Sequence, residues 1–184
     1  MSETRKKRKQ KELIQWIASL IIVVAIAFII RTFVVCPVMV KGISMEPNFH
    51  HGDIVLVNRL EYRFSEPKKD DIVICDYESS TNEKKIIKRV IGVGGDTIDF
   101  VWTDHKYYTL ELNGENVDEP YINEDMYHLG DISLPYKVGE GEYFVMGDNR
   151  NESNDSRYAQ VGAIKKKNIT GKVFMSLKPF RIIK

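Results

Sequence analysis

The sequence predicts a mainly β domain preceded by one long N-terminal helix. A single apolar run, Leu13–Ile30, lies near the N-terminus and is long enough to cross a bilayer as a helix. After residue 35, short runs rich in Ile and Val alternate with clusters of Gly, Pro, Asp and Asn, which is typical of strands joined by turns. No later stretch keeps a helical period over about ten residues.

The N-terminal helix has the composition of a membrane span. Among the eighteen residues of Leu13–Ile30, only Gln15 and Ser19 are polar. At ~1.5 Å per residue the run is about 27 Å long, close to the hydrocarbon thickness of a bilayer. The basic cluster Arg5–Lys9 precedes it. By the positive-inside rule, this cluster places the N-terminus in the cytoplasm and the chain after residue 35 outside.

Two other interpretations of this helix compete with a membrane anchor. A buried core helix would not be expected to be apolar on all sides and to follow a cluster of lysines. A cleavable signal peptide needs small residues after its apolar run, whereas the triplet Ala25-Ile26-Ala27 lies inside the run. We therefore expect a basic cytoplasmic tail (1–12), an uncleaved anchor (13–35) and one extracytoplasmic domain (36–184).

The charge distribution argues against nucleic-acid binding. Residues 1–35 hold seven basic and two acidic residues, a net charge of +5, whereas the remaining 20 basic and 24 acidic residues give −4. A nucleic-acid binder carries its positive charge on the folded domain. The lipid bilayer, and not a nucleic acid, is the partner that this asymmetry predicts.

The expected strands follow one another closely through the domain. An Asn113-Gly114 pair favours a two-residue type I′ hairpin turn. Residues 103–140 are polar, rich in tyrosine and loop-like, so we expect an inserted subdomain there. Strands are predicted at Val34–Val40, Asp53–Leu60, Asp71–Asp76, Lys85–Val93, Thr97–Trp102, Glu142–Met146 and Lys172–Leu177.

The cysteines and histidines give little indication of a disulfide or a metal site. Cys36 and Cys75 are the only two cysteines; a single bridge would not be a disulfide framework, so two free thiols are favoured over a pair. The four histidines lack metal-ligand spacing. We expect neither a metal nor a cofactor.

Lys88 is the first candidate for chemistry. A strand would place it on one face with Ile86 and Val90. Burial disfavours an ammonium, and a lysine whose pKa falls to ~8 would be neutral often enough to act as a general base. The alternative is an edge lysine whose charged end reaches water. The residues alone leave both interpretations open.

Ser44 and the segment Gly147–Arg157 are the other candidates. Ser44 lies in a short turn between Gly42 and Pro47, so it is either a nucleophile or an ordinary turn residue. Gly147–Arg157 is almost wholly polar, and a solvated loop is its default interpretation. Its acidic and basic residues alternate in sign, however, as in an ion-paired loop that holds a hydroxyl in place.

Four segments together carry a resemblance to a known family. In order along the chain they resemble the sequence blocks of type I (bacterial) signal peptidases, and the short chain with one span is similar to the Gram-positive form. With the N-terminal anchor, the resemblance covers the whole chain except 103–140. The segments are Ser44–Pro47, Gly52–Arg59, Lys88–Asp96 and Gly147–Arg157.

The resemblance implies a fold and a chemistry. The fold would be a coiled antiparallel β-sheet catalytic domain. Ser44 would be the nucleophile and Lys88 the general base. Ser153 would orient the Lys88 amine, and the substrates would be signal peptides of exported preproteins with small residues at the first and third positions before the cut.

The remaining implied roles concern support and substrate binding. Asp155 and Arg157 would pair to brace the loop, with Asp148 in support. The Ser44 backbone N–H would be the main oxyanion donor. The substrate and oxyanion region would include Gly42, Ile43, Met45 and Pro47.

The sequence departs from the family pattern at two places. Gly42 stands where Gram-negative relatives carry a serine whose hydroxyl assists the oxyanion, so that donor is missing. Asn48 and Phe49 stand where threonine and leucine are more usual, which we expect to matter little.

Two rival functions remain. A self-cleaving repressor with the same dyad would need a DNA-binding domain in place of the span. An inactive relative that assembles surface fibres would be expected to lose the dyad, whereas Ser44 and Lys88 are both present. A membrane-bound serine endopeptidase that removes signal peptides is the function predicted.

Overall fold

A computed structural model describes residues 2–29, 31, 34–79, 82–103 and 106–183 of the chain. The chain divides into two compact units, Met1–Cys36 and Pro37–Lys184.

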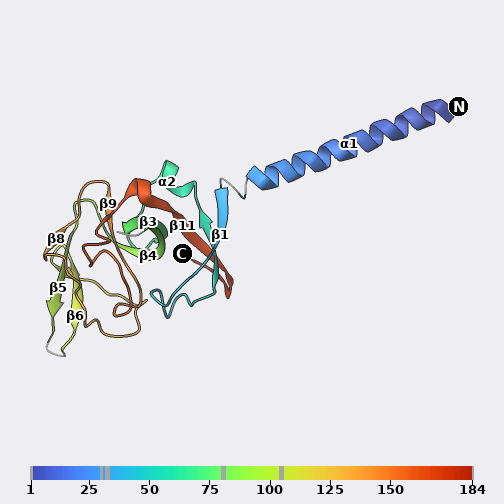
Figure 1. Cartoon of the computed structure of the whole chain (residues 1–184). Helices are drawn as coiled ribbons and strands as arrows, with labels where there is room; N and C mark the ends of the chain where they lie inside the picture. Colours follow the sequence, from blue (N-terminus) through green and yellow to red (C-terminus); the bar gives the residue numbers. More distant parts are fainter. Residues whose placement is uncertain (1, 30, 32–33, 80–81, 104–105, 184) are drawn as a thin grey trace. The chain divides into compact units, whose positions relative to one another are not determined.

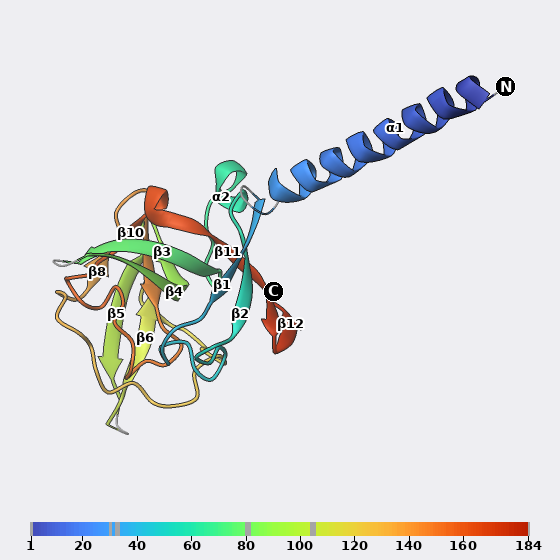
Figure 2. The same ribbon diagram turned by 45° about the vertical axis from the view of Figure 1, so that its right-hand side comes forward.

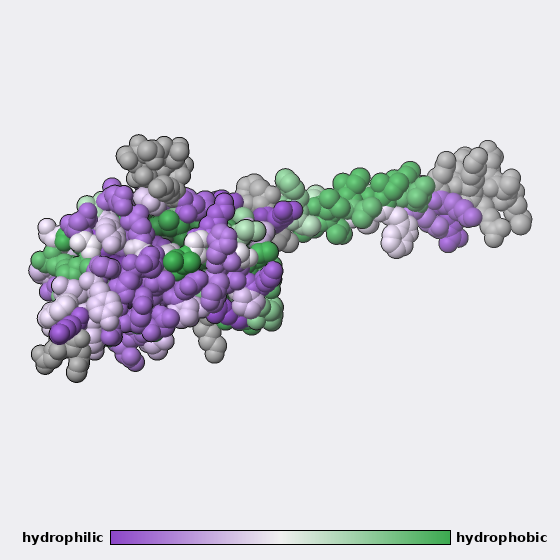
Figure 3. All heavy atoms as spheres, turned by 60° about the horizontal axis from the view of Figure 1, so that its bottom comes forward, coloured by the Kyte–Doolittle hydropathy of each residue, from purple (hydrophilic) through white to green (hydrophobic). Residues whose placement is uncertain are grey.

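The first unit is built on one long helix, α1 (Ser2–Ile29). Within it, Lys11–Phe28 is long and apolar enough to cross a membrane, and none of this stretch is buried. Figure 3 shows the apolar side chains along the helix and hydrophilic ones toward its N-terminal end. The helix starts before the expected span of 13–35 because lysine, arginine, glutamine and glutamate are good helix formers. At the other end, Val35, the last residue of the expected span, lies in strand β1 (Val35–Met39) and not in the helix, and residues 30, 32 and 33 lie outside the described residues.

The second unit contains a large sheet whose described pairings are antiparallel (Figure 1). The strand order is β1-β2-β11-β3-β4-β9-β10, and β12 pairs with β11. Strand β11, from the C-terminal part of the chain, thus lies between β2 and β3. The strands are β1 (Val35–Met39), β2 (Ile54–Asn58), β3 (Ile72–Ser79), β4 (Asn82–Val93), β9 (Glu142–Met146), β10 (Ile164–Lys165), β11 (Ile169–Lys178) and β12 (Phe180–Ile182).

A smaller antiparallel sheet has the order β7-β6-β5-β8 and is seen at the lower left of Figure 2. Asn113 and Gly114 join β6 to β7 and both have positive φ, 57° and 82°, as a type I′ turn requires. The predicted hairpin is therefore confirmed. The strands are β5 (Thr97–Trp102), β6 (Tyr108–Leu112), β7 (Glu115–Asn116) and β8 (Tyr136–Lys137).

The mainly β prediction is confirmed, because every strand predicted from the sequence is present. Helix in the second unit is limited, in its described part, to the single turn of α2 (Glu61–Phe64) and the 3₁₀ turn η2 (Lys166–Asn168). The short strands β8, β10 and β12 were not predicted, since two or three residues are too few to show a period.

Three apolar clusters form the core of the second unit. One cluster packs β2, β3 and β11 side chains against Met45 and Phe49, which follow β1. A second lies around β9 and β10, and a third joins the smaller sheet to Phe144 and Met146 of β9. Strand β9 therefore contributes side chains to both sides of the domain. No disulfide is present among the described residues, and Cys75 is fully buried.

Candidate active site

Lys88 lies in the middle of β4, where β3 pairs with one edge of the strand and β9 with the other. Its side chain is buried, with 2% of the residue exposed. The charged end of Lys88 therefore does not reach water, and the alternative of an edge lysine is wrong. The Nζ atom lies 2.6 Å from the Oγ of Ser44, a short hydrogen-bonding distance.

Burial changes the acidity of this amine. Removal from water lowers the pKa of Lys88 from 10.5 to about 8, although the nearby negative charges of Asp155 and Asp148 act in the opposite direction. At pH 7 about one molecule in ten then carries a neutral amine, against fewer than about one in a thousand at the ordinary pKa. A proton acceptor is therefore available beside a hydroxyl.

Ser44 lies in the turn that follows β1. The turn is held by backbone hydrogen bonds, from Glu46 N to Ile43 O and from Phe49 N to Met45 O. It is also held from outside by Asn149, whose backbone N–H donates to Ser44 O at 3.1 Å and whose side chain donates to Ile43 O at 3.2 Å. The nucleophile candidate is thus fixed to the segment that follows β9.

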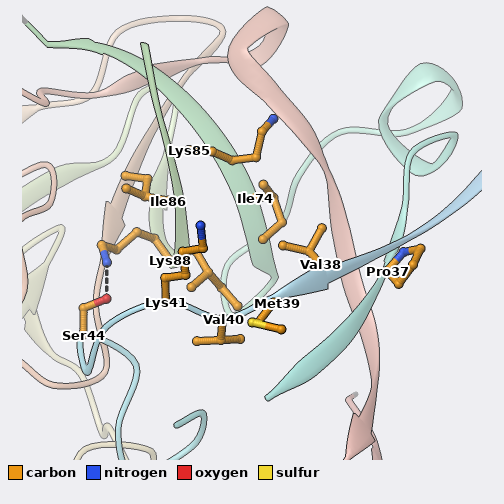
Figure 4. A pocket seen from close by; sticks show the side chains of 11 residues that line it. Pro37, Val38, Met39, Val40, Lys41, Ser44, Ile74, Lys85, Ile86 and Lys88 are labelled. Atoms are coloured by element: carbon orange, nitrogen blue, oxygen red, sulfur yellow. Dashed lines mark hydrogen bonds between the residues drawn. The ribbon is translucent and has the colours of Figure 1, made fainter. Parts of the chain in front are cut away.

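A cleft of about 490 Å³ opens beside Ser44 and Lys88. Figure 4 shows it between β1, with the residues that follow it, on one side and β3 and β4 on the other. Strands β1 and β4 are far apart in the sheet order, so the sheet must coil to bring them to opposite walls. Its lining is largely apolar: Pro37, Val38, Met39, Val40, Lys41, Ser44, Ile74, Lys85, Ile86, Ile87 and Lys88.

The segment Gly147–Arg157 is folded into the domain. The default interpretation of a solvated loop is wrong, because most of its charged residues are buried; the buried polar residues are Asp148, Arg150, Ser153, Asp155, Ser156 and Arg157. The implied pair of Asp155 with Arg157 is present, with Nε 2.8 Å from Oδ1 and both side chains fully buried.

The Asp155 carboxylate accepts several hydrogen bonds. It accepts from the Gly147 N–H at 3.0 Å and from the Ser153 hydroxyl at 2.6 Å, besides its bonds from Arg157. Burial alone would raise the pKa of Asp155, but the Arg157 guanidinium and these hydrogen bonds hold it below its ordinary value. The carboxylate is therefore charged at the pH where Lys88 titrates.

Asp148 pairs with Arg89, the residue next to Lys88 on β4. Both carboxylate oxygens are bound, at 2.8 Å by Nε and 2.7 Å by Nη2. Since neighbours on a strand point to opposite faces, this pair lies on the other face of β4 from the Lys88 amine. Asn48 also donates to Asp148 at 2.8 Å and to the carbonyl of Tyr121 at 2.7 Å. The departure at Asn48 therefore has a structural role that sequence reasoning missed.

Glu119 is the other residue that sequence reasoning missed. It forms a buried ion pair with Arg150, whose Nε also donates to Gly147 O at 3.1 Å. The ring of Tyr121 lies beneath the Arg89 guanidinium, 3.9 Å from its carbon to the ring centroid. Alternation of charge within 147–157 could not reveal this pair, because Glu119 lies 31 residues earlier.

Gly147 has no room for a side chain. A Cβ built there would lie 2.3 Å from Ser44 O and 2.3 Å from Ser153 Oγ. Such contacts are far inside van der Waals distance. Glycine is what allows the end of β9 to approach the backbone of the nucleophile candidate.

The other predicted site residues differ in how deeply they are buried and in whether they line the cleft. Ser153 is buried, and its hydroxyl donates to Asp155. Gly42 has a φ of 90°, which suits glycine. Met45 is a core residue at 1% exposure. None of Gly42, Ile43, Met45 and Pro47 belongs to the described residues that line the cleft.

Comparisons with known proteins agree with the sequence motifs. The family described as signal peptidase, peptidase S26, matches residues 13–178. Signal peptidase I of Bacillus licheniformis is 37% identical, with 100% of this chain and 98% of that protein covered. Signal peptidase IB of Staphylococcus aureus (strain Mu50) is 36% identical, with coverage of 93% and 92%.

A crystal structure of a signal peptidase I from Enterococcus faecalis V583 also matches, at 31% identity and a TM-score of 0.44, over 59% of this chain and 97% of that one. The family assignment rests on the sequence matches, which run nearly the full length of the chain. The chain therefore belongs to the signal peptidase family, peptidase S26, and is a serine endopeptidase of that family.

Proposed function

We propose that this protein removes signal peptides with Ser44 as the nucleophile and Lys88 as the general base. The observation that carries the proposal is the 2.6 Å separation of Ser44 Oγ and a buried lysine Nζ at the head of an apolar cleft. The family assignment supports the reaction, and this geometry supports Ser44 and Lys88 as the residues that carry it out.

The neutral Lys88 amine takes the proton of the Ser44 hydroxyl as Oγ attacks the carbonyl carbon of the scissile peptide bond. The resulting ammonium then protonates the leaving amine, which releases the mature chain and leaves an acyl ester on Ser44. A water molecule, deprotonated by the same lysine, cleaves the ester and regenerates the hydroxyl. The serine proton thus leaves on the new amine, and water supplies both the proton that restores the Ser44 hydroxyl and the oxygen of the new carboxylate, so the cycle consumes one water and returns Lys88 to its neutral form.

The oxyanion that forms during attack needs donors at the turn. The backbone N–H of Ser44 makes no other hydrogen bond within the described part of the chain, which leaves it available for this role. The Ser153 hydroxyl donates to Asp155, and its oxygen can still accept a hydrogen bond from Lys88. Our prediction that it orients the amine therefore requires only that the two side chains approach within hydrogen-bonding distance.

Apolar side chains of the cleft, such as those of Val38, Val40 and Ile86, suit the small apolar residues expected before the cut. The helix α1 would anchor the protein in the bilayer, with its basic end in the cytoplasm and the second unit outside. Anchoring would raise the local concentration of the site where a translocated precursor emerges.

Replacing Ser44 by alanine tests the nucleophile. The full chain in a non-ionic detergent is expected to cut a secretory precursor after a small residue, and Ser44→Ala to lower the rate by about 10³-fold or more. The matched control is Ser133→Ala, an exposed serine outside the cleft, which should cut at the native rate. Cleavage by Ser44→Ala at a rate near native would refute the assignment.

The pH profile tests the base independently. Because the neutral amine is the active form and the pKa of Lys88 is lowered to about 8, kcat/KM should rise about tenfold from pH 7 to a plateau above pH 9. The measurement is kcat/KM for one peptide substrate from pH 6 to 10. A flat profile over this range would exclude a lysine that titrates near 8 as the base.

A further inference from the structure

The cleft beside Ser44 carries an unbalanced positive charge. Three of its lining residues are lysines, and no carboxylate belongs to the described residues that line it. The cleft is thus positively charged, although the second unit as a whole has a net negative charge. The three lysines differ in how their charges are compensated.

Two of the three lysines have partners. Lys85 forms an ion pair with Asp76 at 2.8 Å and also contacts Thr170. Lys88 is buried, directed at Ser44, and lies within the field of Asp155 and Asp148. Their charges are therefore compensated within the protein.

Lys41 is the third lysine, and it is exposed. None of the ion pairs or side-chain hydrogen bonds in the described parts of the chain involves it. Figure 4 shows its side chain pointing up into the cleft, beside Lys88 and above Val40. A cation in this position is available to a bound substrate.

The position of Lys41 limits which part of a substrate it can reach. It precedes Ser44 by three residues, so the two Cα atoms are at most about 11 Å apart. An extended substrate advances about 3.3 Å per residue. Side chains within about three residues of the scissile bond, on either side, are therefore within reach of the Lys41 ammonium.

We propose that Lys41 is a specificity-determining residue that favours substrates with a carboxylate side chain within three residues of the scissile bond and disfavours those with a lysine or arginine there. The inference rests on the proposed function, since it assumes that the cleft beside Ser44 binds the substrate. The attraction is that of an exposed ion pair, so it is modest and is screened by salt.

A set of matched peptides tests the proposal. Each peptide carries Glu, Gln or Lys at one of the six positions around the cut, except the two that require small residues. For the native full chain in non-ionic detergent at low salt, kcat/KM should be about two- to fivefold higher for Glu than for Gln at one or more positions, and correspondingly lower for Lys. Raising the salt concentration to about 1 M should reduce both differences.

Three variants locate the effect. Lys41→Met should make the Glu, Gln and Lys peptides equal, whereas Lys41→Glu should reverse their order. The matched control is Lys137→Met, which removes an exposed lysine of β8 away from the cleft and should keep the native preference. Within each protein the Gln peptide is the reference for the Glu and Lys peptides, and the control Lys137→Met should cleave it at the native rate.

The outcomes separate this proposal from the assignment of the dyad. Equal rates for Glu, Gln and Lys peptides at every position in the native protein would overturn the role of Lys41, as would a preference that persists in Lys41→Met. In both cases Ser44-dependent cleavage of the Gln peptides would leave the proposed function standing. If the Gln peptides are not cleaved at all, both proposals fail.

Discussion

Lys88→Met is expected to be inactive and yet more stable than the native protein at pH 7. Loss of the general base should lower cleavage by about 10²–10⁴-fold. Stability should rise because the pKa of Lys88 is lowered from 10.5 to about 8 by burial, a difference worth about 3 kcal/mol. Methionine has a similar shape and places no charge in the core.

The sign of this stability difference depends on pH in a defined way. Below pH 8 both the folded and the unfolded chain carry the Lys88 charge, so the cost of burying it is fully present. Between pH 8 and 10.5 the folded state is neutral while the unfolded state is still charged, and the cost declines as pH rises. The advantage of Lys88→Met should therefore fade over this interval and be absent above it.

Denaturant unfolding at pH 7, 9 and 11 measures this difference. The control is Lys85→Met on the same strand, whose side chain is 52% exposed and paired with Asp76; its effect should stay within about 1 kcal/mol. A Lys88→Met protein that is less stable than native at pH 7 would contradict the view that the amine is held in its site at an energetic cost.

Asp155→Asn should be among the most destabilising single changes in the chain. The substitution keeps the size of the side chain but removes the carboxylate that pairs with Arg157, and both residues are fully buried. An unpaired buried charge costs about 3–5 kcal/mol. Cleavage should also fall, because Asp155 holds the Gly147 N–H and the Ser153 hydroxyl.

Asp76→Asn is the matched control for this change. Its ion pair with Lys85 is about as short, 2.8 Å, but the two side chains are 39% and 52% exposed. Water replaces the lost partner there, so the free energy of unfolding should change by about 1 kcal/mol or less. An equal loss of stability in the two variants would contradict the view that burial makes the Asp155–Arg157 pair the more stabilising of the two. The double variant Asp155→Asn/Arg157→Met, which leaves no unpaired charge at this site, should recover part of the stability that Asp155→Asn loses.

Much of this site could be predicted because its chemistry is carried by short contiguous motifs. Ser44 and Lys88 are predicted from blocks that each span only a few residues, and the structure brings them to 2.6 Å. The strands were predicted because β-branched runs and turn residues are local signals. Lys88 left two interpretations open, since its burial depends on β9, which pairs with β4 from more than fifty residues further along the chain.

The environment of Gly147–Arg157 could not be predicted for the same physical reason. Its polarity indicated solvent, but its charges are balanced by residues that are distant in sequence: Glu119 for Arg150 and Arg89 for Asp148. Whether a charged residue is buried depends on the arrival of such a partner. The pattern of residues within the segment does not reveal these distant partners. The role of Asn48 was missed for the same reason, because it binds Asp148 and the carbonyl of Tyr121.

The placement of β11 between β2 and β3 has a consequence for the order in which the protein matures. Ribosomes deliver the chain from its N-terminus, so Ser44 and then Lys88 are made long before Ile169–Lys178. Until β11 is available, β2 lacks the neighbour that joins it to β3 and β4. Ser44 follows β1 and Lys88 lies on β4, on opposite sides of β11 in the strand order, so we expect a nascent chain without β11 to lack the proposed dyad and to be inactive.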